Sequence, residues 1–381
     1  MRMEFRNLKR QYVYLKEKID ENIRSVIESS SFIGGHIVEV LEHDLASCVN
    51  VKHCITCANG TDALQIALMV WGIGKGDAVF VPDFTFFSSG EVVSAVGATP
   101  IFVDVSNDTF NMNPLSLEEQ IRRVIEVGRL APKVIIAVDL FGQPAEHYEI
   151  RRLADKYELL VLEDGAQGFG SRINCNKACS FGDISTTSFF PAKPLGCYGD
   201  GGALFTDNDE WAEIIRSIKV HGKGFNKYDN VRIGMNSRLD AIQAAVLEVK
   251  LPVFMTDELL KEQKIAAKYT EQLHDIVKTP SILKDFFPSW AQYTIQLPER
   301  KHRDNLQKYL KDNNIPSMVY YQKPMHRQKA FENNDYEYDE EMYQVTNKLC
   351  ETVLSLPFDP YKNDEEIDLV CETIKKYMGS L

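Results

Sequence analysis

The sequence predicts an α/β fold, in which a large domain with a mainly parallel sheet (residues 1–250) precedes a small α+β domain (251–381). In the first part, short apolar runs alternate with amphipathic helical runs, a pattern typical of parallel strands joined by helices. From about Leu251 the pattern changes to longer charged helices with few strands. A chain of 381 residues is also too long for one ordinary core.

The elements follow in order along the chain. Helical spacing runs through 8–29 and 36–48, and the helices expected between later strands are 61–72, 115–127 and 146–157. The predicted strands are the runs "HCITCA", "AVFV", "PIFVDV", "KVIIAVDLF", "LLVLED" and "STTSFF". The second part holds a long charged helix, "AQYTIQL", another helix, "PSMVYY" and a terminal helix. Because no low-complexity linker separates the two parts, we expect them to pack together.

The charge of the chain excludes several classes of partner. The formal net charge is -12 and no Lys/Arg run offsets it, which disfavours nucleic acid and anionic membrane surfaces. No apolar run approaches the roughly 20 residues of a membrane helix. The start, "MRMEFRNLKRQ", is charged and amphipathic, unlike a signal peptide. We therefore expect a cytoplasmic protein.

Eight cysteines are spread along the chain, which predicts reduced thiols rather than a disulfide framework. Two close pairs, Cys54 with Cys57 and Cys175 with Cys179, raise the alternative of a zinc site. However, "HCITCA" alternates like a buried strand, and no compact Cys/His pattern completes a ligand set. We expect no metal.

The stretch "SFFPAKPLGCYGDGG" contains Lys193, the only charged residue between Ile184 and Gly199. A lone lysine in a loop is ordinarily solvated, but aromatic residues, prolines and glycines on both sides favour enclosure. Enclosure disfavours the ammonium form and lowers the pKa, which frees the amine to attack a carbonyl carbon. The pattern indicates an imine-forming lysine.

The glycine-rich segments do not match nucleotide-binding motifs. "GCYGDGG" lacks the Gly-Lys-Ser/Thr ending of a P-loop, and "GFGSRI" lacks the third glycine of a dinucleotide fingerprint. A phosphate site is predicted instead at "CANGTDALQIAL", where Gly60 and Thr61 open an apolar helix after a strand. The alternative there is an ordinary N-cap.

Two further residues suit the same chemistry. Asp164 ends the buried run "LLVLED" at the carboxyl edge of the sheet, where ligands bind. Beside an imine-forming lysine and a phosphate site, a carboxylate there would pair with the ring nitrogen of pyridoxal phosphate. Phe86, in "PDFTFFSSG", could lie against the flat ring. The alternative interpretation of Asp164 is a residue that forms a turn, and that of Phe86 is a residue packed in the core.

Together these motifs resemble the DegT/StrS family of nucleotide-sugar aminotransferases, from about residue 5 to beyond 355. The resemblance implies an aspartate-aminotransferase-like fold, that of a fold type I pyridoxal phosphate (PLP) enzyme. It implies that Lys193 binds the cofactor as an imine and later moves a proton between cofactor and substrate carbons. The other implied cofactor contacts are Asp164 at the ring nitrogen, Gln167 at the ring hydroxyl side, Phe86 on the ring, and Gly60, Thr61 and Ser188 at the phosphate.

Two more blocks resemble family segments. "RIGMNSRLDAIQAAV" is similar to a segment that crosses a dimer interface, which implies a homodimer with composite sites. There Asn236 would reach the phosphate of the neighbouring site and Arg238 would lie near the sugar; an ion pair at the helix start is the alternative for Arg238. "SMVYYQKPMH" is similar to a substrate-facing stretch, which implies substrate contacts for Tyr320, Tyr321 and His326.

The implied reaction transfers an amino group from L-glutamate to a keto carbon, C3 by similarity, of a UDP-linked keto sugar derived from N-acetylglucosamine. Such sugars serve surface polysaccharide or lipid A synthesis. Uronate-specific relatives have His-Tyr where this chain has Tyr320-Tyr321, so a 3-keto sugar with a C6 hydroxymethyl group and a 4-keto-6-deoxy sugar stay open.

Three other functions occur on the same fold. Relatives that dehydrate sugars at C3 have a histidine in place of the lysine, and Lys193 argues against that reaction. A cysteine desulfurase would need a reactive loop cysteine, and nothing marks Cys197 or Cys350 as one. A non-catalytic regulatory protein on the same fold stays an alternative, because some relatives are described as regulators.

Overall fold

The computed structural model describes residues 3–226, 228–332, 334 and 336–379. Its main sheet has seven strands in the order β1-β9-β8-β5-β4-β2-β3. β9 is antiparallel to both of its neighbours, while the other pairs are parallel, so the predicted mainly parallel sheet is confirmed. The strands are β1 (His53–Cys57), β2 (Asp77–Pro82), β3 (Thr99–Val103), β4 (Ala131–Val138), β5 (Leu160–Asp164), β8 (Ile184–Ser188) and β9 (Gly202–Thr206).

The five predicted large-domain helices are confirmed, with ends within two residues of the predicted ones, and the structure adds α4 and α7. Side-chain caps explain where several begin: the Asn59 and Asn113 side chains each accept a first-turn N–H, and Pro114 occupies the first helical position of α5. The helices are α1 (Leu8–Ser29), α2 (His36–Val49), α3 (Gly60–Val70), α4 (Ser88–Ala95), α5 (Pro114–Val127), α6 (His147–Tyr157) and α7 (Asp209–Ile218).

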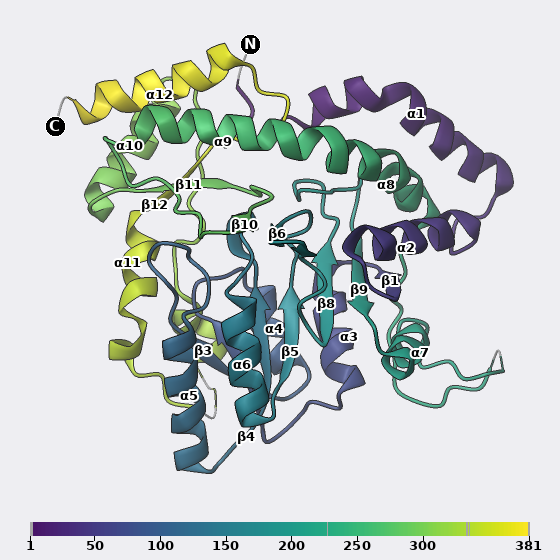
Figure 1. The fold of residues 1–381 in the computed structure, drawn as a ribbon. Helices are drawn as coiled ribbons and strands as arrows, with labels where there is room; N and C mark the ends of the chain where they lie inside the picture. Colours follow the sequence, from purple (N-terminus) through teal and green to yellow (C-terminus); the bar gives the residue numbers. More distant parts are fainter. Residues whose placement is uncertain (1–2, 227, 333, 335, 380–381) are drawn as a thin grey trace.

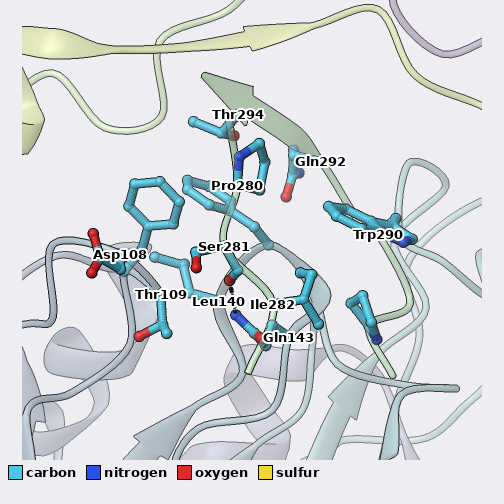
Figure 2. A pocket seen from close by; sticks show the side chains of 13 residues that line it. Asp108, Thr109, Leu140, Gln143, Pro280, Ser281, Ile282, Trp290, Gln292 and Thr294 are labelled. Atoms are coloured by element: carbon cyan, nitrogen blue, oxygen red, sulfur yellow. Dashed lines mark hydrogen bonds between the residues drawn. The ribbon is translucent and has the colours of Figure 1, made fainter. Parts of the chain in front are cut away.

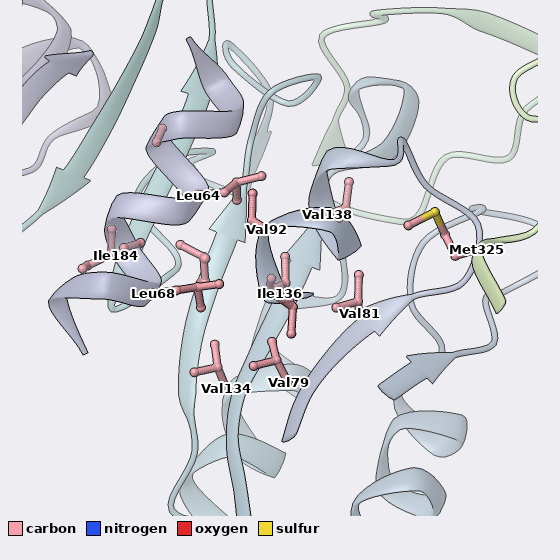
Figure 3. Close-up of a cluster of buried hydrophobic side chains, with 14 of the residues drawn as sticks. Leu64, Leu68, Val79, Val81, Val92, Val134, Ile136, Val138, Ile184 and Met325 are labelled. Atoms are coloured by element: carbon pink, nitrogen blue, oxygen red, sulfur yellow. The ribbon is translucent and has the colours of Figure 1, made fainter. Parts of the chain in front are cut away.

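Both faces of the sheet are buried, which explains why the strands read as continuous apolar runs. Val79 and Val81 of β2 point to the side of α3, where Leu64 packs among strand residues (Figure 3). The alternate residues Ala78 and Phe80 join the core under α5 and α6. The sheet is thus the middle of three layers, and only its edges and strand ends are open to a ligand.

The predicted division at residue 250 falls inside a long helix. α8 (Ala241–Val253) continues through one π turn (Phe254–Glu258) into α9 (Leu259–Leu273), which crosses above the sheet beside α12 (Figure 1). The division stays a prediction. A separate core surrounds β11 (Tyr293–Gln296), β12 (Val353–Leu356), α10 (Arg300–Asp312) and α12 (Asp364–Met378).

Two chain segments cross between the parts. Met3 packs in the small-domain core, whereas Met325 and Tyr343 pack in a large-domain core. The segment containing Met325 is fastened to the loop after β2, because its N–H donates to the Asp83 carbonyl at 3.0 Å. It comprises the 3₁₀ turns Met325–Arg327, Lys329–Phe331 and Glu340–Tyr343, and α11 (Gln344–Thr352).

The remaining elements are short. The run "PSMVYY" makes a single bridge, Met318 with Ser355, rather than a strand. A small sheet joins β6 (Arg172–Ile173), β7 (Asn176–Lys177) and β10 (Phe286–Phe287), and a 3₁₀ turn covers Leu140–Gly142. Among the described residues, no helix combines the length and apolar character needed to cross a membrane.

Candidate active site

The predicted site residues gather at the carboxyl edge of the main sheet. β5 ends in Asp164 and β8 ends in Ser188. Between β8 and β1, the reversed strand β9 begins at Gly202, which pairs with Ser188 on one side and with Cys57 on the other. The turn after β1 is therefore brought next to the end of β8, although about 130 residues separate them in sequence.

This juxtaposition brings the predicted phosphate residues together. A Cβ at Gly60 would lie 2.7 Å from the Ser188 Cβ, so only glycine allows the approach. The Thr61 hydroxyl is hydrogen-bonded to the Ser88 hydroxyl at 2.8 Å. The amides of Gly60 and Thr61 are in the first turn of α3, where helical N–H groups lack intrahelical partners and favour an anion. The predicted phosphate residues are thus adjacent and chemically suited to phosphate.

Asp164 is buried and oriented by two donors. Its Oδ2 accepts a hydrogen bond from the Ser89 hydroxyl at 2.8 Å, and its Oδ1 accepts one from the Ala166 N–H at 3.2 Å. Ser89 is itself buried, in the first turn of α4. Sequence analysis missed Ser89; the polar pair "SS" after an aromatic run was the available signal. These contacts hold a carboxylate at the strand end.

Lys193 is half-buried in the loop between β8 and β9, and its N–H donates to the Phe190 carbonyl at 2.8 Å. Burial lowers the pKa of its ammonium group, and the negative charge of Asp164 opposes that shift. The loop is tight at Gly196, where a Cβ would lie 2.5 Å from the Pro191 carbonyl oxygen. The environment thus favours the uncharged amine more than water does, and a carboxylate lies nearby.

α8 fastens the lysine loop from behind. Lys250 is buried, and its Nζ donates to the Gly196 carbonyl at 2.7 Å and lies 4.3 Å from the centre of the Tyr198 ring. The Gln243 Oε1 accepts the Tyr198 N–H at 2.9 Å. Burial lowers the pKa of Lys250 to about 8. Sequence analysis missed both residues; a lysine within an apolar helical run was the available signal.

Gln167 connects the cofactor side to the small domain. Its Oε1 accepts the Phe141 N–H at 2.9 Å, which directs Nε2 toward the Tyr321 hydroxyl at 3.2 Å. Burial raises the pKa of Tyr321, so its hydroxyl stays protonated. The Phe86 ring is about half exposed and lies 6.3 Å from the Tyr321 ring. Tyr320 is half-buried beside Phe5 and Tyr321.

Three predicted residues lie apart from this group. The buried His326 ring places Nδ1 2.7 Å from an Asp83 oxygen and stacks on Tyr343, contacts that hold its segment on the large domain. Asn236 is exposed on an extended segment that pairs with Val220. Arg238 makes no hydrogen bond or ion pair within the described part of the chain, so the alternative ion pair is not formed. The substrate and phosphate roles of these residues stay predictions.

A separate pocket lies between the loop after β4 and the segment 280–294 (Figure 2). None of the predicted site residues line it. Gln143 crosses its floor, where Nε2 donates to the Ser281 carbonyl at 3.1 Å and Oε1 accepts the Leu283 N–H at 3.0 Å. These bonds fix the small domain to the loop that contains Phe141, the partner of Gln167.

Comparison with known proteins agrees with this geometry. The model of the DegT/DnrJ/EryC1/StrS aminotransferase family matches residues 13–375. The chain belongs to this family. An aminotransferase of the DegT/StrS type from Brucella abortus has a crystal structure that matches with a TM-score of 0.96 at 44% identity, covering 99% of this chain and 100% of that one. The predicted fold type I architecture is therefore confirmed.

Two curated DegT/StrS relatives span nearly the whole chain. The UDP-2-acetamido-2-deoxy-3-oxo-D-glucuronate aminotransferase of Pseudomonas aeruginosa is 40% identical over 98% of this chain and 99% of its own. A protein of Geobacillus stearothermophilus named pleiotropic regulatory protein is 39% identical over 99% of both chains. Membership makes the protein an aminotransferase, and the cofactor of this family is PLP.

The residues present fit PLP. The glycine at position 60 leaves room beside Ser188 for a phosphate, and Asp164 offers a carboxylate at the sheet edge. Lys193 lies close enough for the charge of Asp164 to affect its pKa. An anion site, a carboxylate and an amine with a lowered pKa are the groups that a phosphorylated pyridine aldehyde requires.

Ser89→Ala is expected to weaken PLP binding by about 10- to 100-fold, because a hydrogen bond to a charged group contributes about 1.5–3 kcal/mol. Equilibrium dialysis of the apoprotein against PLP measures this. The control is Ser94→Ala, which removes an exposed hydroxyl from the same helix and should change nothing. Equal affinity of the two variants would show that Ser89 does not support Asp164.

Proposed function

We propose that this DegT/StrS protein transfers the amino group of L-glutamate to C3 of a UDP-linked 3-keto sugar derived from N-acetylglucosamine. The observation that carries the proposal is the placement of Lys193, Asp164 and the Gly60–Ser188 cradle at one sheet edge. The 40% identity with a UDP-3-oxo-glucuronate aminotransferase supports the substrate class.

Each residue has a defined task. When bound, PLP supplies an electron-withdrawing ring that acidifies the carbon bearing the amino group. Lys193 binds the cofactor through Nζ and, once released, carries the proton removed from the substrate carbon, since it is held beside that carbon. Asp164 pairs with the ring nitrogen through a carboxylate already oriented by Ser89. Gln167 donates from Nε2 on the ring hydroxyl side.

The identity of the sugar depends on the residues that face its C6 substituent. The half-buried Tyr320 phenol offers no positive charge to a uronate carboxylate. A 3-keto sugar with a C6 hydroxymethyl group therefore competes with the 3-keto uronate, and a 4-keto-6-deoxy sugar comes third. One or two contacts distinguish these sugars, so a panel of substrates is needed.

Visible absorption spectroscopy tests the proposal. Purified protein should show the band of lysine-bound PLP, and L-glutamate without any sugar should bleach it. Adding each UDP-keto sugar in turn should restore the band only with the true acceptor. Absence of the band, even after PLP is added, would contradict the proposal. It would favour a regulatory role, as in the name of the G. stearothermophilus relative.

We further propose a homodimer with composite sites, in which Asn236 contacts the phosphate of the neighbouring site and Arg238 contacts the sugar. The support is an apolar surface on and beside the segment that contains them. Phe225 and Ile233 are almost fully exposed, and Phe32 and Ile33 are joined to the same region. Neighbouring exposed apolar side chains are typical of a surface that binds another protein chain.

Phe225→Asp with Ile233→Asp is expected to raise the dimer dissociation constant by at least about 100-fold, since burying a large apolar side chain contributes about 1.5–3 kcal/mol. Sedimentation velocity measures the change. The control is Leu115→Asp, which charges an equally exposed apolar residue on α5 and should leave the dimer intact. A monomeric parent protein, or a double variant as dimeric as the parent, would count against the composite site.

We also propose that the reaction takes place in the cytoplasm and supplies an amino sugar for surface polysaccharide or lipid A synthesis. All eight cysteines are free thiols in the structure, which suits a reducing compartment. Activity confined to the cytosolic fraction of lysed cells is the expected result.

A further inference from the structure

Three buried ionisable side chains lie behind Asp164, on the side away from the site just described. Asp139 follows β4, His147 begins α6 and Glu163 precedes Asp164 in β5. All three are at most 3% exposed, and one polar atom of each lies within 4.8 Å of the others. None has a task in the proposed reaction, so their charges need a separate explanation.

Glu163 is surrounded by donors. Its carboxylate accepts the N–H groups of Cys179, Phe181 and Gly182 at 2.5, 2.8 and 3.3 Å, and the Ser185 hydroxyl at 2.7 Å. Several hydrogen bonds to the charged form favour a carboxylate over a carboxylic acid. Glu163 is therefore the partner that keeps the negative charge.

Asp139 is placed differently. Its Oδ1 accepts the Ala145 N–H at 2.9 Å and faces His147 Nε2 at 2.7 Å. Its Oδ2 is buried and receives no hydrogen bond from the described residues, and the Glu163 carboxyl group lies within 4.8 Å of the Asp139 carboxyl group. A proton on Oδ2 would turn this unpartnered acceptor into a donor to Glu163. Two adjacent buried carboxylates, both charged, would instead repel each other.

The effect of burial on the neighbouring groups is consistent with one proton shared by Asp139 and Glu163. Burial raises the pKa of Asp139 to about 8 and that of Glu163 to about 7. Burial lowers the pKa of His147 to about 4, so a neutral ring donates from Nε2 to Asp139. The other ionisable groups whose charges act on these three side chains are Arg151 on α6, Asp164 on β5 and the Cys179 thiol.

We propose that Asp139 and Glu163 share one proton, carried by Asp139, and that this pair is a positioning element for Asp164. The Asp139 N–H donates to the Asp164 carbonyl at 3.1 Å, and Glu163 is its neighbour in β5. Repulsion between two charged carboxylates would push Asp139 away from Glu163 and disturb its backbone hydrogen bond to Asp164. Gly168 makes the arrangement possible, because a Cβ there would lie 2.4 Å from Asp139 Oδ2. The part that concerns the cofactor rests on the proposed function.

Asp139→Asn tests the shared proton in the apoprotein. The amide keeps an acceptor for Ala145 and His147 and places a donor toward Glu163, so the variant mimics the protonated acid. Infrared difference spectra at pH 6 should show a protonated carboxyl band in the parent protein that the variant lacks. The control is Asp104→Asn, because Asp104 accepts hydrogen bonds on both oxygens and should contribute no such band. An unchanged carboxyl absorption in Asp139→Asn would overturn the proposal.

Thermal unfolding of the apoprotein gives a second readout. Because the pKa of Asp139 is higher in the folded state than the ordinary value near 4, the folded state binds the extra proton, and stability falls as pH rises toward about 8. The parent should lose more thermal stability than Asp139→Asn between pH 6 and pH 9. Parallel curves would contradict the shared proton. So would a divalent metal that copurifies with the parent one to one and is lost in the variant.

PLP titration tests the positioning role. Between pH 7 and pH 9, the parent should lose up to about tenfold more PLP affinity than Asp139→Asn, because loss of the shared proton weakens the backbone hydrogen bond that positions Asp164. Equal losses in the two proteins would remove the positioning role and leave the shared proton standing. If the parent binds no PLP at all, the proposed function fails, while the infrared result still decides the protonation of Asp139.

Discussion

Lys193→Ala is expected to lower the rate of amino transfer from L-glutamate by more than about 10⁴-fold, because it removes both the nucleophile and the proton carrier. The nearest other lysine fastened to this loop, Lys250, cannot replace it, since its Nζ is engaged behind the loop with the Gly196 carbonyl. Stopped-flow absorbance of the glutamate half-reaction measures the rate. Some PLP should still bind through the phosphate cradle.

Two controls show whether Lys193→Ala loses activity because the amine is absent or because the protein is misfolded. Adding methylamine should restore part of the rate, since a small free amine can occupy the space left by the side chain. Lys177→Ala, a lysine of β7 outside the site, should transaminate normally. Ordinary transamination by Lys193→Ala without added amine would refute the assignment.

Asp164→Asn is expected to slow the same half-reaction by about 10³-fold, the upper range for the loss of one preorganised electrostatic contact. The amide is nearly isosteric with the carboxylate but carries no negative charge to stabilise a protonated ring nitrogen. The Ser89 hydroxyl and the Ala166 N–H would still hold the side chain in place. The loss should therefore be seen in the rate more than in the fold.

The thermal unfolding temperature of Asp164→Asn provides the control, and it should stay close to that of the parent. Asp183→Asn is a matched substitution outside the site, where the carboxylate accepts the Val161 N–H and pairs with Arg151. It should affect stability and leave the half-reaction rate unchanged. A rate for Asp164→Asn within tenfold of the parent would show that the ring nitrogen has another partner.

Much of this molecule could be predicted from its sequence, because local pattern and tertiary structure agree. Strands such as β2 and β4 contain continuous apolar runs since both faces of the sheet are covered, and the starts of α3 and α5 coincide with Asn caps. Lys193 and Asp164 stood out because one is a charge in an apolar loop and the other ends a buried strand. Both signals arise within a few neighbouring residues.

The missed residues depend on contacts that no local pattern contains. Ser89 and Lys250 act on Asp164 and Gly196 from helices far away in sequence. The reversed direction of β9 also has no local signature, since its run "GALFT" resembles a parallel strand equally well. The surroundings of His326 also have no local signature, since the residue buried against it, Asp83, is far away in sequence; its substrate role stays a prediction.

The return of the segment after Tyr321 to the large domain determines which parts can move together. Tyr321 is bonded to Gln167, and four residues later Met325 is anchored to the Asp83 carbonyl. Tyr321 is therefore held to the large domain at two points within five residues. The position of its phenol is fixed by the part of the molecule that contains Lys193, although Tyr321 lies in the C-terminal part of the sequence.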